Sequence, residues 1–161
     1  MRMSEGVEWA LHTCANLAWV EPGDAVPAAR LAAVFGLPAA YLNKQLQALA
    51  RAGILTSTSG PRGGFRLARA PEAISALDVV VAIEGAEDAF RCARILADSP
   101  WGDPAVDYRA TCAISQTMRR AELAWRRELA GQSIADIVGA VERRNPGTGE
   151  RLRRWLTAAR A

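Results

Sequence analysis

Residue types that build catalytic or cross-linked sites are scarce in this sequence: there are three cysteines, one histidine and one lysine in 161 residues. Three cysteines are too few for a disulfide scaffold, and their odd number favours a reducing compartment. No run approaches the roughly 20 apolar residues that a membrane-spanning helix needs. The N-terminal segment mixes acidic with apolar residues, unlike a signal peptide. The chain also has no phosphate-binding loop and no Ser/His/Asp set, so we expect a soluble, cytoplasmic protein that is not an enzyme.

The basic residues are concentrated in one part of the chain. The net charge is only +3, and half of the residues are hydrophobic, which is enough for a core. Residues 25–71 nevertheless hold six basic residues and no acidic one, so the remainder carries −3. The six are Arg30, Lys44, Arg51, Arg62, Arg66 and Arg69. A biased genome would explain arginine in place of lysine, but not the missing acids. Such a segment is typical of a surface that faces nucleic-acid phosphates.

Apolar spacing predicts a mainly α-helical fold with one small β-hairpin. Val7, Leu11, Cys14 and Leu17 form the apolar stripe of a helix, and Cys14 is expected to be a buried structural thiol. We expect helices over 5–20, 27–35, 38–52, 112–130 and 133–142, and a further helix within 71–84. The helix over 133–142 is expected to start with a cap formed by Ser133 and Asp136. Strands are expected over 54–58 and 65–69, with a glycine-rich turn between them, a loop-rich stretch over 85–111, and a linker over 145–149 before a basic helix.

Two short helices followed by a glycine-tipped hairpin are the parts of a winged helix-turn-helix. Leu42, Leu46 and Leu49 would anchor the second helix, which leaves its polar residues facing outward. Asn43 and Gln47 have the amides that read base edges, and lysine serves phosphate or guanine. The predicted DNA contacts are Ala40, Tyr41, Asn43, Lys44 and Gln47 on this helix and Arg62 on the wing. The alternative is a small helical domain whose polar face is merely solvated.

Four segments of the sequence carry a family resemblance: YLNKQLQALARAGILTS at 41–57, GPRGGFRLA at 60–68, DVVVAIEG at 78–85 and SIADI at 133–137. In these segments the sequence resembles the Rrf-two-type (IscR/NsrR) family of bacterial transcriptional regulators. It covers residues 1–142 and implies a homodimer that binds a palindromic DNA operator, with a long helix crossing the partner. We therefore divide the chain into a DNA-binding domain (1–75), a cluster loop with a dimerisation helix (76–142) and a basic C-terminal tail (143–161).

Cluster-binding members of this family place three cysteines in the loop before the dimer helix, whereas this chain has two. Cys92 and Cys112 match the outer positions. A 2Fe–2S cluster needs four protein ligands, and Glu8 and His12 lie one helical turn apart on one face. Imidazole and carboxylate both bind iron. The set is similar to the RsrR-like redox-sensing branch, which implies that Cys92 and Cys112 of one subunit meet Glu8 and His12 of the other around a 2Fe–2S cluster.

Several alternatives to this cluster stay open at the level of sequence. A lone histidine on a helix is more often an ordinary residue than a ligand. Zinc accepts the same ligands and would form a static site, and Cys92 with Cys112 would also serve as a dithiol switch. Trp9 lies beside Glu8 and either packs at the interface or repacks when the charge of the cluster changes. We expect a redox-sensing regulator; the alternatives are an iron-free or nitric-oxide-responsive repressor of the same family, or a protein-interaction module that does not bind DNA.

Overall fold

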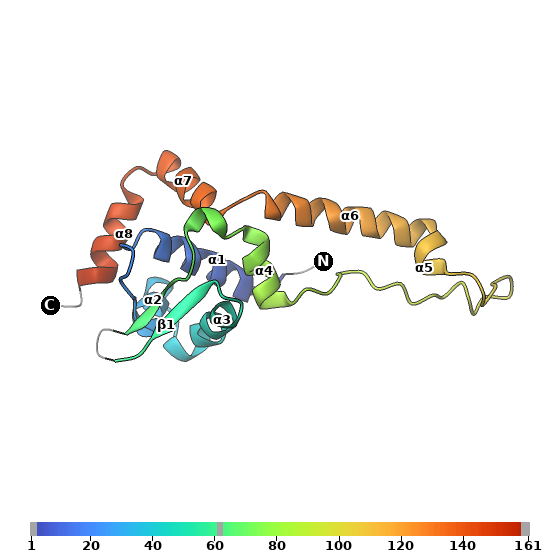
Figure 1. Ribbon diagram of the computed structural model, residues 1–161, viewed down its shortest axis with the longest axis horizontal. Coiled ribbons are helices and arrows are strands. Elements are labelled where there is room, and N and C mark those ends of the chain that lie inside the picture. Colours follow the sequence, from blue (N-terminus) through green and yellow to red (C-terminus); the bar gives the residue numbers. More distant parts are fainter. Residues whose placement is uncertain (1–2, 61–62, 159–161) are drawn as a thin grey trace.

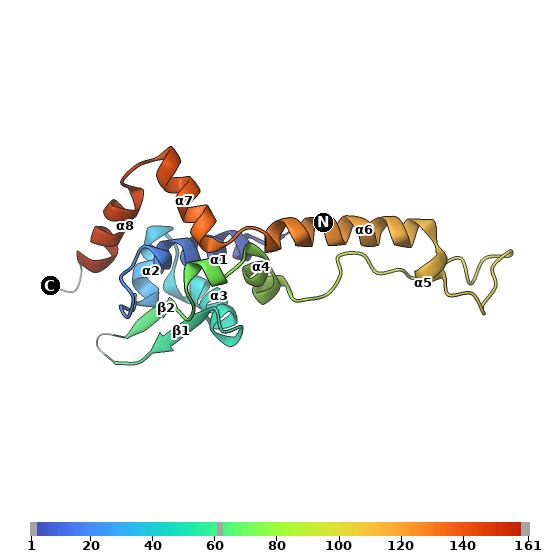
Figure 2. The ribbon, with the colours of Figure 1, turned by 45° about the horizontal axis from the view of Figure 1, so that its top comes forward.

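The computed structural model describes residues 3–60 and 63–158, arranged as a body and a projecting arm. In chain order the elements are α1 (Glu5–Ala18), α2 (Ala28–Val34), α3 (Ala39–Arg51), β1 (Leu55–Thr58), β2 (Gly64–Leu67), the 3-10 helix η1 (Pro71–Ala73), α4 (Ala76–Glu84), α5 (Tyr108–Thr111), α6 (Ala113–Ala130), α7 (Ile134–Arg144) and α8 (Thr148–Thr157). Helices α1–α4, α7 and α8 and the hairpin form the body. The arm consists of α6, α5 and the extended segment that runs back to α4 (Figure 1, Figure 2). The expected fold class, mainly α-helical with a small β-hairpin, is confirmed.

Helix α1 lies at the centre of the body. It contacts α3, α4, α7 and α8. Its predicted stripe is buried at Val7, Cys14 and Leu17, each at most 4% exposed, and half-buried at Leu11. Helix α3 packs against it through Leu42, Leu46 and Leu49, which have no exposed surface. Spacings of three and four residues place these side chains on one face of each helix, so burial of that face determines which residues point outward.

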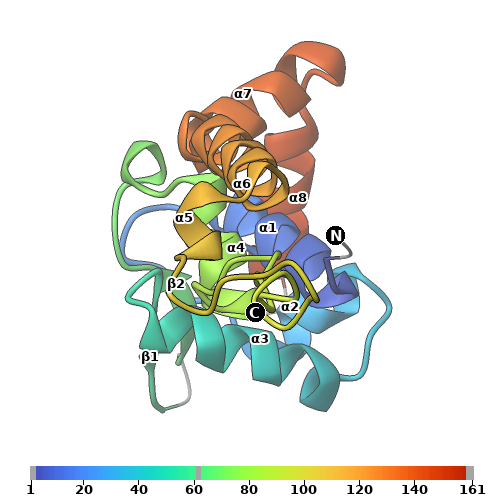
Figure 3. The same ribbon diagram turned by 90° about the vertical axis from the view of Figure 1, so that its right-hand side faces the viewer.

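The wing is an antiparallel hairpin in which Leu55 pairs with Leu67 and Thr58 with Gly64. Its second strand also pairs with the segment before α2, because Val26 and Phe65 exchange backbone hydrogen bonds of 2.8 Å. Gly64 has φ +152°, and a Cβ there would lie 2.3 Å from the carbonyl oxygen of Val26. Glycine is therefore required for this close approach. The hairpin and α3 lie on one side of the body, opposite α7 (Figure 1, Figure 3).

Two capped helix starts lie side by side at the base of the arm. Ser75 and Asp78 form a capping box at α4, and Ser133 and Asp136 form the predicted one at α7. The two cap residues are paired as an isolated antiparallel bridge. The amide of Ala76 donates to the carbonyl of Gln132 at 2.7 Å, and the amide of Ile134 donates to the carbonyl of Ile74 at 2.8 Å. These bonds join the end of α6 to the body.

The C-terminal helix α8 packs on the body more closely than the sequence predicts. It begins at Thr148, inside the predicted linker, and Leu156 lies in the core. Arg30 of α2 donates to the carbonyl of Trp155 at 2.5 Å and lies 4.3 Å from the centre of its ring. The proposed division at residues 75 and 142 stays a prediction. No helix in the described parts of the chain has the length and apolar character needed to cross a bilayer.

We predict that Gly149→Ala loosens α8, because a Cβ at this buried position would lie 2.5 Å from Cδ1 of Trp19. Such overpacking should lower the free energy of unfolding by about 1–3 kcal/mol in urea titrations. Gly131→Ala is the control, since Gly131 has ordinary helical angles and its Cβ would be 3.5 Å from the nearest atom. Equal stability of the two variants would contradict this account of α8.

Candidate functional site

The outward face of α3 holds the residues predicted to contact DNA. Ala40, Asn43, Lys44 and Gln47 are exposed, and Tyr41 is 54% exposed. Because the leucines on the opposite face are completely buried, these side chains are held in one orientation on the body. Arg62, the predicted wing contact, lies outside the described residues. The structure therefore presents five of the six predicted residues on one helix surface.

The basic face is narrower than the charge count over 25–71 indicates. Arg30 points to α8 rather than outward. Arg69 donates to the carbonyl of Ala73 at 3.1 Å and lies 3.8 Å from a carboxylate oxygen of Asp78. A count of charges over 25–71 cannot reveal these contacts of Arg30 and Arg69, because the residues that they contact lie outside that range. Lys44, Arg51 and Arg66 make no ion pair with the described residues.

The two non-cysteine candidate ligands lie on the exposed face of α1. Glu8 and His12 are both exposed and are separated by one helical turn. The His12 ring lies 6.1 Å from the ring of Phe35, the residue that ends α2. Trp9 is half-buried, and its ring makes an edge-to-face contact with Tyr41 of α3, with ring centres 4.8 Å apart. Helix α1 thus contacts α3 through Trp9, and its His12 lies near Phe35, the C-cap residue of α2.

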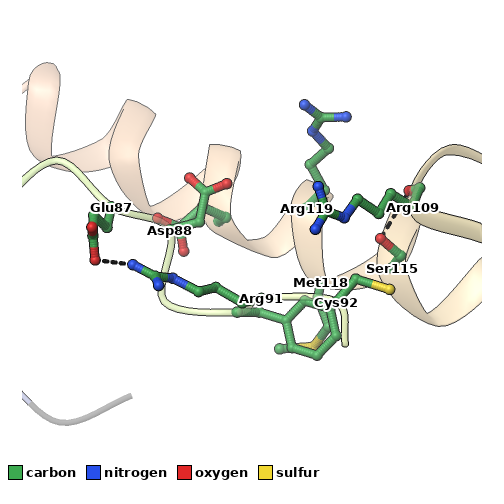
Figure 4. Close-up of a pocket in the computed structure, with 10 residues that line it drawn as sticks. Glu87, Asp88, Arg91, Cys92, Arg109, Ser115, Met118 and Arg119 are labelled. Atoms are coloured by element: carbon green, nitrogen blue, oxygen red, sulfur yellow. Dashed lines mark hydrogen bonds and ion pairs between the residues drawn. The ribbon is translucent and has the colours of Figure 1, made fainter. Parts of the chain in front are cut away.

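The two candidate cysteine ligands lie in the arm, where both are free, half-buried thiols. Cys112 is the residue that precedes α6. Cys92 lies in the extended segment and lines a pocket of about 440 Å³ between that segment and α6 (Figure 4). The pocket is lined by Glu87, Asp88, Phe90, Arg91, Cys92, Arg109, Ser115, Met118, Arg119 and Glu122. It therefore combines one thiol with several charged groups.

A buried carboxylate attaches the cysteine segment to α6, and sequence reasoning missed it. The Glu122 side chain is 8% exposed and accepts hydrogen bonds from Trp125 at 2.9 Å and from Arg126 at 2.7 Å. Arg126 in turn donates to the backbone carbonyls of Ala86 and Glu87 at 3.1 and 3.3 Å. Burial alone would raise the pKa of Glu122, but these bonds and one from the amide of Ala89 lower it. The four-residue spacing of Glu122 and Arg126 is visible in the sequence and indicates an ion pair on a helix. Exposed ion pairs have the same spacing, so it did not indicate that this carboxylate is buried.

The third cysteine is unlike the other two. Cys14 has no exposed surface, and burial raises the pKa of its thiol to about 12. A neutral, inaccessible thiol neither binds metal nor reacts readily. The prediction that Cys14 is a buried structural thiol is therefore confirmed.

The four candidate ligands do not come together within one chain. Helix α1 lies in the body, whereas Cys112 lies beside α5 at the far end of α6 (Figure 1, Figure 2). The described residues of one chain contain no group of three or more His, Cys, Asp and Glu side chains that would hold a metal ion. The structure thus separates the donors into a thiol pair on the arm and a Glu/His pair on the body.

The fold and the outward face of α3 define a winged-helix transcriptional regulator. A family model described as an iron-dependent transcriptional regulator, Rrf2, matches residues 3–140. The chain belongs to the Rrf2 family of transcriptional regulators, as its sequence motifs indicate, and it is not an enzyme.

Curated relatives support the same assignment. A protein named as an HTH-type transcriptional regulator in Mycobacterium tuberculosis strain H37Rv is 32% identical over 139 residues, which cover 86% of this chain and 82% of that protein. IscR of Vibrio cholerae is 30% identical over 92 residues, or 57% of this chain and 53% of IscR.

Solved structures share the fold at lower sequence identity. The structure of T. potens IscR has a TM-score of 0.68 and 19% identity, and the match covers 94% of this chain and 96% of that one. The oxidized form of Staphylococcus aureus CymR has a TM-score of 0.64 and 23% identity, with coverages of 86% and 96%.

Proposed function

We propose that this Rrf2-family protein is a dimeric regulator that binds a palindromic operator and senses redox state through a 2Fe–2S cluster, as in the RsrR-like branch. The observation that carries the proposal is the division of the donors between arm and body. A long arm that holds two thiols away from the body is suited to meet the Glu8/His12 face of a second copy. Each shared site would then contain four protein ligands, the number that such a cluster needs.

The chemistry of the residues fits this group. Cys92 and Cys112 form no disulfide and are half-buried, so they are accessible yet partly shielded from water. Glu8 and His12 make no ion pair or side-chain hydrogen bond among the described residues, so both side chains are free to bind metal. The bound cluster would supply one-electron redox chemistry. The chain would supply two thiolates from one subunit, and one imidazole and one carboxylate from the other.

A short chain of contacts links the candidate ligands to the recognition helix. Trp9 follows Glu8 directly, and its ring meets Tyr41, one of the predicted DNA contacts. Trp9 is next to Glu8 and three residues before His12, so a change of charge at these two residues would act close to a ring that packs on α3. We infer that Trp9 transmits the redox state to the DNA-binding surface by changing its packing on Tyr41.

The cofactor is tested by anaerobic reconstitution with visible spectroscopy and iron and sulfide assays. We predict that Cys92→Ala and His12→Ala lose the cluster, because each removes one of four ligands. Cys14→Ala is the matched control and should keep it. A wild-type protein that binds no iron and sulfide refutes the proposal; bound zinc without sulfide would instead support a static metal site, and a reversible Cys92–Cys112 disulfide a dithiol switch.

DNA recognition is tested with duplexes selected from a random library, which we expect to be inverted repeats. Asn43→Ala should weaken binding by about 1–3 kcal/mol and relax the preference at one base pair in each half-site. Lys44→Ala should weaken binding to all sequences and reduce the salt dependence, if it contacts phosphate. Gln132→Ala, at an exposed position outside α3 and the wing, is the control. Affinity that does not change with salt would contradict a phosphate-contacting surface.

A further inference from the structure

Two arginines in the arm pocket have no anionic partner among the described residues of their own chain. Arg91 forms an ion pair with Glu87, and Arg126 with Glu122. Arg109 and Arg119 line the same pocket, but their guanidinium groups make no ion pair or hydrogen bond within residues 3–60 and 63–158. In Figure 4 the side chains of Arg109 and Arg119 extend in different directions. Two positive charges without an ion-pair partner line this pocket, so the pocket is suited to an anionic group.

The acidic face of α1 has the complementary pattern. Glu5 and Glu8 lie in the first turn of α1, both are exposed, and neither forms an ion pair among the described residues. Positions 5, 8 and 12 are separated by three and four residues, so Glu5, Glu8 and His12 form one stripe along the helix. If Glu8 and His12 face a partner, Glu5 faces it too, one turn nearer the N-terminus.

We propose that the arm pocket is the docking site for the first turn of α1 of a second copy, with Arg109 and Arg119 binding Glu5 of the partner subunit. The inference rests on the proposed function: Cys92 lines the pocket, and a cluster that it shared with the partner subunit's Glu8 and His12 would place the partner's α1 beside the pocket. The rim of the pocket supports a protein occupant. Met118 lines the pocket and is 40% exposed, and Ile114, one turn earlier on α6, is 69% exposed. Apolar side chains that adjoin on an exposed helix face are typical of a protein-binding surface.

Charge complementarity here would set the register of the dimer. A two-fold interface contains the contact twice, so each subunit's arm would hold the other's α1. Glu5 would thus act as a guide that brings Glu8 and His12 to the thiols, without itself being a ligand. The site would already be assembled in the cluster-free dimer.

The test is the monomer–dimer equilibrium of the cluster-free protein, measured by sedimentation at low salt. Glu5→Arg and Arg119→Glu should each weaken the dimer about 25-fold, because each reversal costs about fivefold per exposed pair and the pair occurs twice. The double variant Glu5→Arg with Arg119→Glu restores opposite charges, and its dissociation constant should return to within about fivefold of wild type. High salt should reduce all these differences.

Control variants separate this contact from a general effect of net charge. Glu72→Arg and Arg144→Glu change the charge equally at exposed positions outside the pocket, and their dimers should match wild type. The docking site would be overturned if the loss of dimerisation free energy in the double variant equalled the sum of the losses in the two single variants. It would also be overturned if the single variants dimerised as well as these controls. The iron content of the wild-type protein is a separate readout. If the double variant regains dimerisation but the wild-type protein binds no cluster, the docking site stands and the proposed cofactor is refuted.

Discussion

Burial of one side of α1 is the constraint on which the rest of the structure depends. Val7, Ala10, Cys14 and Leu17 fill the centre of the body, and α3, α4, α7 and α8 pack around them. A helix has a fixed angular repeat, so the buried stripe leaves Glu5, Glu8 and His12 facing outward. The same helix presents Trp9 to α3. One packing interaction therefore sets both the candidate ligand face and its contact with the recognition helix.

The arm supplies the complementary half of the site and depends on different interactions. Its base is joined to the body by the paired caps at Ser75 and Ser133, and its extended segment is attached to α6 through Glu122 and Arg126. Arg126 binds backbone carbonyls of the segment and also lies 4.0 Å from a carboxylate oxygen of Asp88, so backbone and side-chain groups together position the segment. The outcome is a thiol pair held at a distance from α1, which makes a second copy part of the proposed site.

Elements whose signal is local were predictable from the sequence. The leucine stripe of α3 and the cap at Ser133 depend on residues within one or two helical turns, and both are confirmed. Features that depend on distant partners were not predictable. The position of α8 rests on contact between Gly149 and Trp19, and Arg30 is diverted to Trp155, a residue 125 positions away. The candidate ligands were identifiable by type and spacing, but their separation between body and arm needed the fold.

The central claim, that each site is shared between subunits, is tested most directly with a mixed dimer. One subunit carries Cys92→Ser and Cys112→Ser, the other carries Glu8→Gln and His12→Ala, and the two are purified together through different tags. Neither homodimer would have a complete site, whereas the mixed dimer would have one intact site formed by the remaining residues of both chains. The account predicts half of the wild-type iron and sulfide in the mixed dimer and none in either homodimer. A folded mixed dimer without iron, or a homodimer that keeps its full cluster, would contradict it.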